Sequence, residues 1–315
     1  MLAPALTHLL PEYARADQLA QRYQALYVRA ATLVNSMAAL AVTIVVAQVL
    51  FFPRDAWLVV FEIAAMTLAV LVLRVSWHEA WHEKWLRDRH LAERLRIAMF
   101  STLMPSDVSR TAVTPEHILP FYRGPETWVL EACDRILRST MIAARSTASV
   151  ESQESPGDME SPLEAMKRFI IDAWIEAQAG WHAENSARKR KAAEHVNMGG
   201  LVLFAATLAM AIGHWAGSGR GEDGNWPGVV ATALAIALPA WAATLHAINT
   251  LLERERIAAR SAQMAAVLHR LAQQAEHATT WPDLTACVSR AEEIMATESH
   301  EWWVSLSFRD LGLPG

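Results

Sequence analysis

Four long apolar stretches constrain the fold of this chain, because each is close to the length that a helix needs to cross a bilayer. They cover residues 30–52, 56–73, 199–215 and 228–252, and a membrane-spanning helix takes roughly 20 apolar residues. Short connections join the first stretch to the second and the third to the fourth. The sequence therefore predicts an all-α integral membrane protein, with two transmembrane hairpins on either side of a long charged middle.

The distribution of basic residues predicts the topology. The connections inside the hairpins, 53–55 and 216–227, contain Arg54 and Arg220 and no other lysine or arginine. All the other basic residues lie before the first span, between the hairpins or after the last span. Because lysine and arginine in short flanks mark the cytoplasmic side, we expect both termini and the middle to be cytoplasmic.

The expected organisation has five parts, and all of those outside the spans are helical. Residues 74–103 carry apolar side chains at helical spacing, so the second span and this segment are expected to form one long helix. A flexible linker is expected where Ser, Glu, Asp and Pro are concentrated. The parts are a cytoplasmic N-terminal helix (1–29), hairpin 1 (30–73), a helical cytoplasmic region (74–198) with its linker (146–162), hairpin 2 (199–252) and cytoplasmic C-terminal helices (253–315).

Polar residues inside the spans are the first candidates for function, because they are costly in lipid. Small and hydroxyl residues form a stripe on the first span and another on the fourth, and Glu62 is the only acidic residue within a span. Such stripes allow close helix packing, but a pore lining has the same composition. The candidate residues for a pore or packing stripe are Thr32, Asn35, Ser36, Thr43, Glu62, Thr232, His246 and Asn249.

A short motif beyond the second span matches the H-E-x-x-H pattern of zinc proteases. It reads WHEAWHEKW, with His78, Glu79 and His82 in the motif positions. On one helix the two imidazoles would lie a turn apart and could share a zinc ion, while the glutamate activates a bound water. The alternative is a helix at the membrane surface whose tryptophans pack or lie at the interface.

The basic run Arg188, Lys189, Arg190 and Lys191 precedes the third span and can contact anionic lipid headgroups. A nucleotide phosphate is the alternative ligand, but no Gly-rich loop accompanies the run. No Ser-His-Asp spacing, Walker motif or pair of catalytic carboxylates is evident, so neither an enzyme activity nor a cofactor is expected. The net charge of -5 does not favour nucleic acid as a partner.

Several segments resemble a family of bacterial membrane modules. They are ADQLAQRYQALYVRAA (16–31), KWLRDRHLAERLR (84–96), TWVLEACDRILRS (127–139), WIEAQAGWHAENSARKR (174–190) and ESHEWWVSLSFRDLGLP (298–314). These pieces resemble SLATT-type effector modules and, more closely, the membrane half of bacterial LSDAT proteins of the SLOG group. The resemblance covers most of the chain, but no strand-rich, Gly-rich SLOG domain precedes residue 16.

The resemblance implies an effector of a bacterial antiphage system. In such a system a nucleotide-derived signal makes the membrane module oligomerise or open a pore in the inner membrane. The signal would bind the cytoplasmic helices or a separate soluble sensor. Two alternatives remain open: a membrane metalloprotease that uses His78, Glu79 and His82, and a non-conducting membrane anchor that recruits a soluble sensor.

Overall fold

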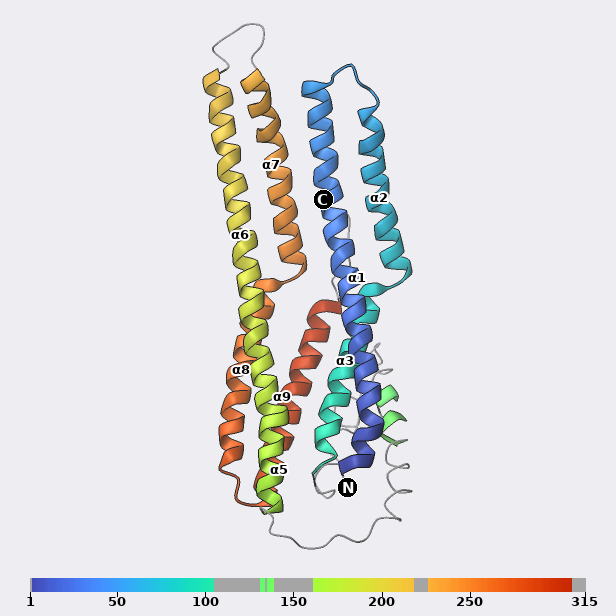
Figure 1. Ribbon diagram of the computed structural model, residues 1–315, viewed down its shortest axis with the longest axis vertical. Helices are drawn as coiled ribbons and strands as arrows, with labels where there is room; N and C mark the ends of the chain where they lie inside the picture. The colour runs from blue at the N-terminus through green and yellow to red at the C-terminus, as the bar shows by residue number, and fades with distance from the viewer. Residues whose placement is uncertain (1, 105–130, 134, 139–160, 218–225, 308–315) are drawn as a thin grey trace. The chain divides into compact units, whose positions relative to one another are not determined.

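The computed structural model describes residues 2–104, 131–133, 135–138, 161–217 and 226–307, and within these ranges it contains helices and no strand (Figure 1). Four of the helices are long and apolar enough to cross a membrane. The predicted all-α membrane fold is thus confirmed. The elements are α1 (Leu2–Phe51), α2 (Leu58–His78), α3 (Trp81–Ser101), α5 (Pro162–Ile170), the π-helical turn η2 (Ile171–Glu176), α6 (Ala177–Gly217), α7 (Trp226–Leu251), α8 (Arg254–Glu276) and α9 (Trp281–Ser307).

The described residues form two compact units. The first, here called the membrane unit, comprises residues 25–81 and 186–259; the second, the charged unit, comprises the described residues of 2–24, 82–185 and 260–307. Helices α1 and α6 each contribute residues to both units. Of the linker expected at 146–162, residues 146–160 lie outside the described part, and Pro162 begins α5.

Each hairpin of the membrane unit ends with the same backbone turn. Ala80 follows α2 with φ 50°, and Glu253 follows α7 with φ 44°. In both turns the residue with positive φ donates its N–H to the carbonyl three residues earlier, at 3.1 and 3.2 Å. The expectation of one long helix from the second span into the segment after it was therefore wrong, because the left-handed residue Ala80 separates α2 from α3.

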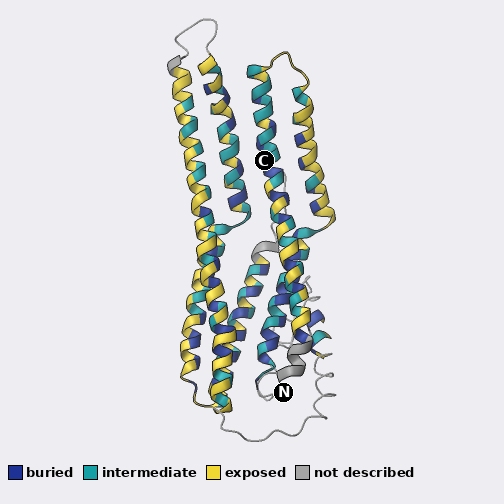
Figure 2. Cartoon of the chain, viewed as in Figure 1, coloured by how far each residue is buried: buried dark blue, intermediate teal, exposed yellow. Residues whose placement is uncertain are grey.

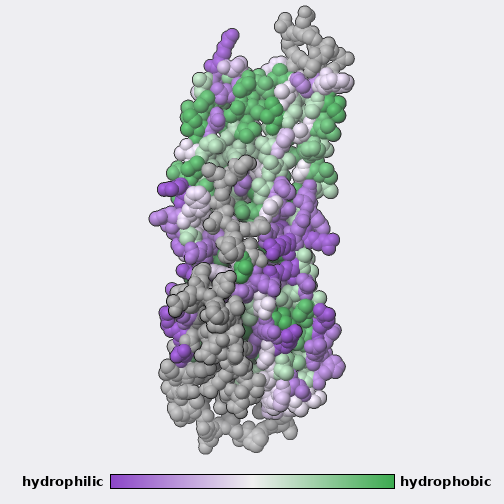
Figure 3. All heavy atoms as spheres, turned by 180° about the vertical axis from the view of Figure 1, so that it is seen from behind, coloured by the Kyte–Doolittle hydropathy of each residue, from purple (hydrophilic) through white to green (hydrophobic). Residues whose placement is uncertain are grey.

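The surface of the membrane unit suits a lipid environment. Large apolar side chains are exposed along α2 and along the apolar end of α6 (Figure 2), and hydrophobic side chains dominate the space-filling view of these helices (Figure 3). Trp57, Trp215 and Trp226 are exposed near the tips of the hairpins. Tryptophans gather where hydrocarbon meets headgroups, so their position marks one end of the spans.

The charged unit has its own apolar core, which is centred on Trp174. This side chain is fully buried on η2, and its ring stacks on Phe100 of α3 with centroids 4.9 Å apart and an interplanar angle of 6°. Leu268 of α8 and Leu284 of α9 are also fully buried in this cluster. Four elements that are distant in sequence are thereby held together by one cluster of side chains.

Candidate functional site

The predicted stripe of the first span contacts the fourth span inside the membrane unit, but through Trp241 and Thr244, which the predicted stripe of the fourth span does not include. Trp241 Nε1 of α7 donates to Thr43 Oγ1 of α1 at 3.2 Å, and Thr244 Oγ1 donates to the carbonyl oxygen of Asn35 at 3.2 Å. Thr43 and Asn35 in turn donate to carbonyls one turn earlier on α1, each at 2.8 Å. In the single chain these groups therefore connect α1 to α7, as packing stripes do.

Two further stripe residues also have partners within the membrane unit. Thr232 Oγ1 lies 2.9 Å from Nδ1 of His214, across the second hairpin. Asn249 Nδ2 donates to Asn197 Oδ1 at 3.3 Å, and Asn197 Nδ2 donates to Glu255 Oε1 at 2.7 Å. This relay joins the end of α7, the middle of α6 and the start of α8, and it occupies the carboxylate of Glu255.

The remaining stripe residues are less enclosed. Thr32 is exposed and donates to the carbonyl of Val28 on its own helix at 2.8 Å. Ser36 and Glu62 are half-buried, and His246 is exposed. Glu62 and His246 have neither an ion pair nor a hydrogen bond within the described part of the chain. Within the described part of one copy, two ionisable groups of the spans thus have no hydrogen-bonding or ion-pair partner.

The H-E-x-x-H motif does not lie on one helix. Helix α2 ends at His78, Glu79 follows it, and Ala80 has the positive φ described above. His78 is exposed, whereas His82 is buried on α3 with its ring 5.7 Å from that of Trp85. Among the described residues no group of three His, Cys, Asp or Glu side chains could hold a metal ion. The expectation that the two imidazoles lie one turn apart on a single helix and share a zinc ion is therefore wrong.

The basic run before the third span divides into two kinds of residue. Arg190 is exposed and pairs with Glu194 at 3.0 Å, and Lys191 is exposed. Arg188, Lys189 and Lys191 have no acidic partner in the ranges that the structure covers. Lys189 is half-buried, and the charges that act on it are those of Arg254 and Arg188. The structure thus adds Arg254, from the start of α8, to the residues expected from the sequence.

The charged unit contains an ionic network that was not predicted from the sequence. Arg89 of α3 pairs with Asp17 of α1 at 3.2 Å and with Glu93 at 2.5 Å. Its guanidinium carbon also lies 5.4 Å from the ring centroid of Trp181 on α6. Because one arginine contacts carboxylates and an aromatic ring from three helices, it fixes how α1, α3 and α6 pack.

Burial shifts the pKa values of several groups around this network. Burial, helped by the nearby charge of Arg89, lowers the pKa of Arg96 to about 10, so Arg96 stays charged at neutral pH and pairs with Glu93. Burial also raises the pKa of Glu298 on α9, and the charges of Arg260, Arg89 and Arg96 oppose that rise. The alternating charges at positions 89, 93 and 96 lie on one helical face, but the sequence did not indicate that this face is covered.

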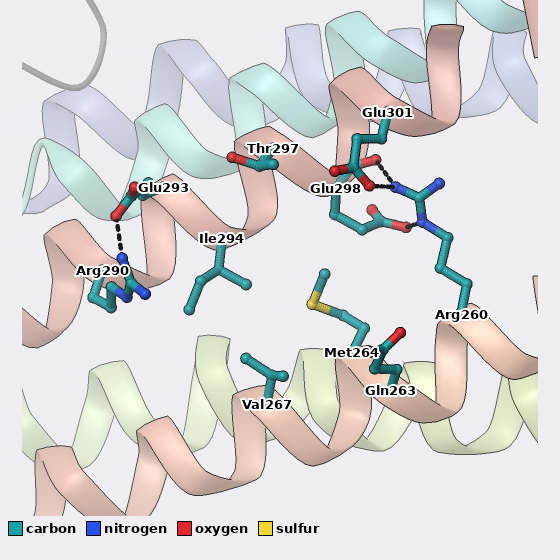
Figure 4. Close-up of a pocket in the computed structure, with 10 residues that line it drawn as sticks. All are labelled: Arg260, Gln263, Met264, Val267, Arg290, Glu293, Ile294, Thr297, Glu298 and Glu301. Carbon is teal, nitrogen blue, oxygen red and sulfur yellow. Dashed lines mark hydrogen bonds and ion pairs between the residues drawn. The ribbon is translucent and has the colours of Figure 1, made fainter. Parts of the chain in front are cut away.

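A groove of about 500 Å³ lies between α8 and α9 (Figure 4). Its floor contains Met264, Val267 and Ile294, and charged pairs stand at both ends. Arg260 contacts Glu298 at 3.6 Å and Glu301 at 2.7 Å, and Arg290 contacts Glu293 at 2.6 Å. Since three glutamates neutralise two arginines, the groove offers no uncompensated cation to a phosphate.

No family model, curated protein or solved structure matches this chain. The resemblance to SLATT-type modules accordingly stays a prediction from the sequence. The features of the molecule that bear on function are the membrane unit, the ionisable residues of its spans and the cations at its edge.

Proposed function

We propose that the chain is a membrane effector whose membrane units assemble from several copies and open a path through the bacterial inner membrane. Both termini and the charged unit lie in the cytoplasm, as the distribution of basic residues favours. The charged unit receives the signal, either a nucleotide second messenger or a soluble sensor protein. The chain acts as the membrane-permeabilising arm of a conflict system and performs no enzymatic reaction.

The observation that carries this proposal is that Glu62 and His246 lie in the spans without a hydrogen-bonding or ion-pair partner in the described part of one copy. Ionisable side chains in spans nearly always face a bundle interior or water, because lipid exposure costs roughly 2.5–3.5 kcal/mol at the centre of a helix and less near its ends. Within one copy, Glu62 is half-buried, His246 is exposed and neither is hydrogen-bonded. Other copies, packed around a water-filled path, would supply the environment that these two residues lack.

A second candidate function is the non-conducting anchor for a soluble sensor. The specific observation in its favour is that two residues of the first-span stripe, Thr43 and Asn35, are bound by Trp241 and Thr244 within one chain. A pore built by several copies therefore needs polar groups other than these four to face a water-filled path, whereas the anchor needs none.

The test is conductance in planar bilayers, with and without nucleotide second messengers, together with the mass of the purified particle in detergent. The proposal expects several copies per particle and discrete openings, with cation selectivity reduced in Glu62→Gln. Glu83→Gln, an exposed acid on α3 outside the spans, is the matched control and should leave selectivity unchanged. Monomeric particles without openings would reject the pore and support the anchor.

A further inference from the structure

Some cations near the ends of the third and fourth spans lack the acidic partners that their neighbours have. Arg190 pairs with Glu194 at 3.0 Å, and Arg256 pairs with Glu253 at 3.4 Å. By contrast, Arg188, Lys189 and Arg254 form no ion pair or hydrogen bond through their side chains within the described ranges. Lys191 has no acidic partner either, but it is exposed, whereas Lys189 is half-buried and the charges of Arg254 and Arg188 act on it. These charges set Arg188, Lys189 and Arg254 apart from Lys191.

The fold brings the three cations together by joining α6 to α8. Ser186 Oγ donates to the carbonyl oxygen of Ala258 at 2.8 Å, and Asn197 Nδ2 donates to Glu255 Oε1 at 2.7 Å. Lys189 follows Ser186 by one turn, and Arg254 precedes Ala258 by one turn. Because these bonds hold the two helices side by side, the charge of Arg254 acts on Lys189 from the neighbouring helix.

The acids closest in sequence on α8 are already engaged. Glu255 accepts the hydrogen bond from Asn197, and Glu253 contacts Arg256. The half-buried ammonium of Lys189 therefore experiences the positive charges of Arg188 and Arg254 without a compensating acid. Like charges repel strongly at short range in the effective dielectric near a protein surface, so such a cluster favours a bound anion.

We propose that Arg188, Lys189 and Arg254 form a binding site for a phosphate group at the edge of the membrane unit. Guanidinium groups match phosphate oxygens with paired hydrogen bonds, and an ammonium adds a point charge. Arg254 comes three residues after Leu251, the end of α7, which places it at the depth of lipid headgroups. The phosphodiester of an anionic lipid is therefore the first source of the phosphate, and a soluble phosphate is the second.

This site does not depend on the proposed pore, because it requires only that the membrane unit be in a bilayer. The test compares unfolding of the full chain, followed by tryptophan fluorescence, in nanodiscs of three kinds. The first contains phosphatidylcholine alone, the second adds phosphatidylglycerol, and the third is phosphatidylcholine with inorganic pyrophosphate in the buffer. A higher Tm in the second identifies a lipid phosphate, and a higher Tm in the third identifies a soluble one.

The variants Lys189→Gln and Arg254→Gln should abolish most of that increase, and Arg190→Gln is the matched control because Arg190 is exposed and already paired. In a lipid titration each lost cation should weaken phosphatidylglycerol binding about fivefold. In pure phosphatidylcholine, Lys189→Gln should have the same Tm as the wild type or a higher one, because repulsion is relieved. No increase with either phosphate, or equal losses in Arg190→Gln and Lys189→Gln, would overturn the proposal.

Discussion

Trp241 and Thr43 are linked by a hydrogen bond of 3.2 Å between the indole Nε1 and the hydroxyl oxygen, across the fourth and first spans. The hydroxyl of Thr43 also donates to the carbonyl of Ala39 at 2.8 Å, so it accepts one bond and donates another. A polar group in the hydrocarbon region is tolerated when it is satisfied in this way. The pair therefore belongs to the packing of the membrane unit.

The first prediction concerns the energy of this pair. In a double-mutant cycle of Trp241→Phe and Thr43→Val, the coupling energy should be about 0.6 kcal/mol, the average found for hydrogen bonds between membrane helices. It is measured from the free energy of unfolding in mixed detergent micelles. Thr32→Val is the control, since Thr32 is exposed and bonds only to its own helix. Zero coupling between Trp241 and Thr43 would contradict the hydrogen bond between them.

The second prediction concerns Glu292, which is buried on α9 with a hydrogen bond to Ser101. Burial raises the pKa of its carboxyl, and the bond to Ser101 partly opposes this rise. Because the folded state holds the proton more tightly, this group favours folding most below the unfolded pKa of 4.5 and loses that contribution as the pH rises through the folded pKa. Glu292→Gln should therefore raise Tm at pH 7 relative to the wild type and leave it nearly unchanged at pH 4.

The adjacent residue provides the control for this experiment. Glu293 is exposed and pairs with Arg290 at 2.6 Å, so Glu293→Gln should change Tm little at either pH, as is usual for surface ion pairs. A lower Tm of Glu292→Gln at pH 7 would mean that the charged carboxylate stabilises the fold, contrary to the expectation.

The sequence was sufficient to predict the membrane spans, because length and apolarity alone determine which helices can cross a bilayer. The turn at Ala80 could not be predicted in the same way. Alanine is the best helix former, and no glycine or proline marks the end of α2, so the apolar periodicity continued across the break. Local preference therefore does not account for the left-handed conformation of Ala80.

The candidate site was predicted only in part, for a related reason. The run 188–191 was visible as four consecutive basic residues, but pairing distinguishes Arg190 from Lys189, and Arg254 comes from a helix more than 60 positions later. The network around Arg89 was missed because alternating charges on a helix usually face water. Its burial depends on Asp17 and Trp181, which belong to other helices.

The third prediction is a loss of stability in acid that originates at His90. Burial, followed by the charges of Arg94 and His300, lowers the pKa of His90 to about 3, and its Nδ1 lies 2.9 Å from Ser299 Oγ. Between pH 6.5 and about 3 the unfolded state binds a proton that the folded state does not, so stability falls as the pH decreases through 6.5. The contribution is about 1.4 kcal/mol for each pH unit below 6.5.

His90→Gln should therefore flatten the dependence of the unfolding free energy on pH between 7 and 5, even if its stability at pH 7 is lower. The comparison uses His277→Gln, which removes an exposed imidazole and should keep the slope of the wild type. Identical slopes in His90→Gln and the wild type would assign the acid sensitivity to other groups.

The fourth prediction concerns the H-E-x-x-H motif. Since the helix breaks between His78 and His82, we expect less than one zinc per ten chains in protein purified without chelator, and no change of Tm when EDTA is added. His82→Ala should lower stability more than His78→Ala, because His82 is buried against Trp85 and His78 is exposed. Stoichiometric zinc that is lost in both variants would reinstate the metal site.

The last prediction tests the two left-handed turns, because Ala80 and Glu253 adopt φ 50° and 44°. A left-handed conformation costs a residue with a side chain about 1–2 kcal/mol, whereas glycine adopts it freely but loses more entropy on folding. Ala80→Gly and Glu253→Gly should therefore stabilise the chain by about 0.5–1 kcal/mol each, less whatever the contact of Glu253 with Arg256 contributes. Ala64→Gly, at an exposed position inside α2, should instead destabilise it by about 1 kcal/mol. If Ala80→Gly and Ala64→Gly changed the unfolding free energy in the same direction, Ala80 would be an ordinary helical residue. Helices α2 and α3 would then form one helix after all.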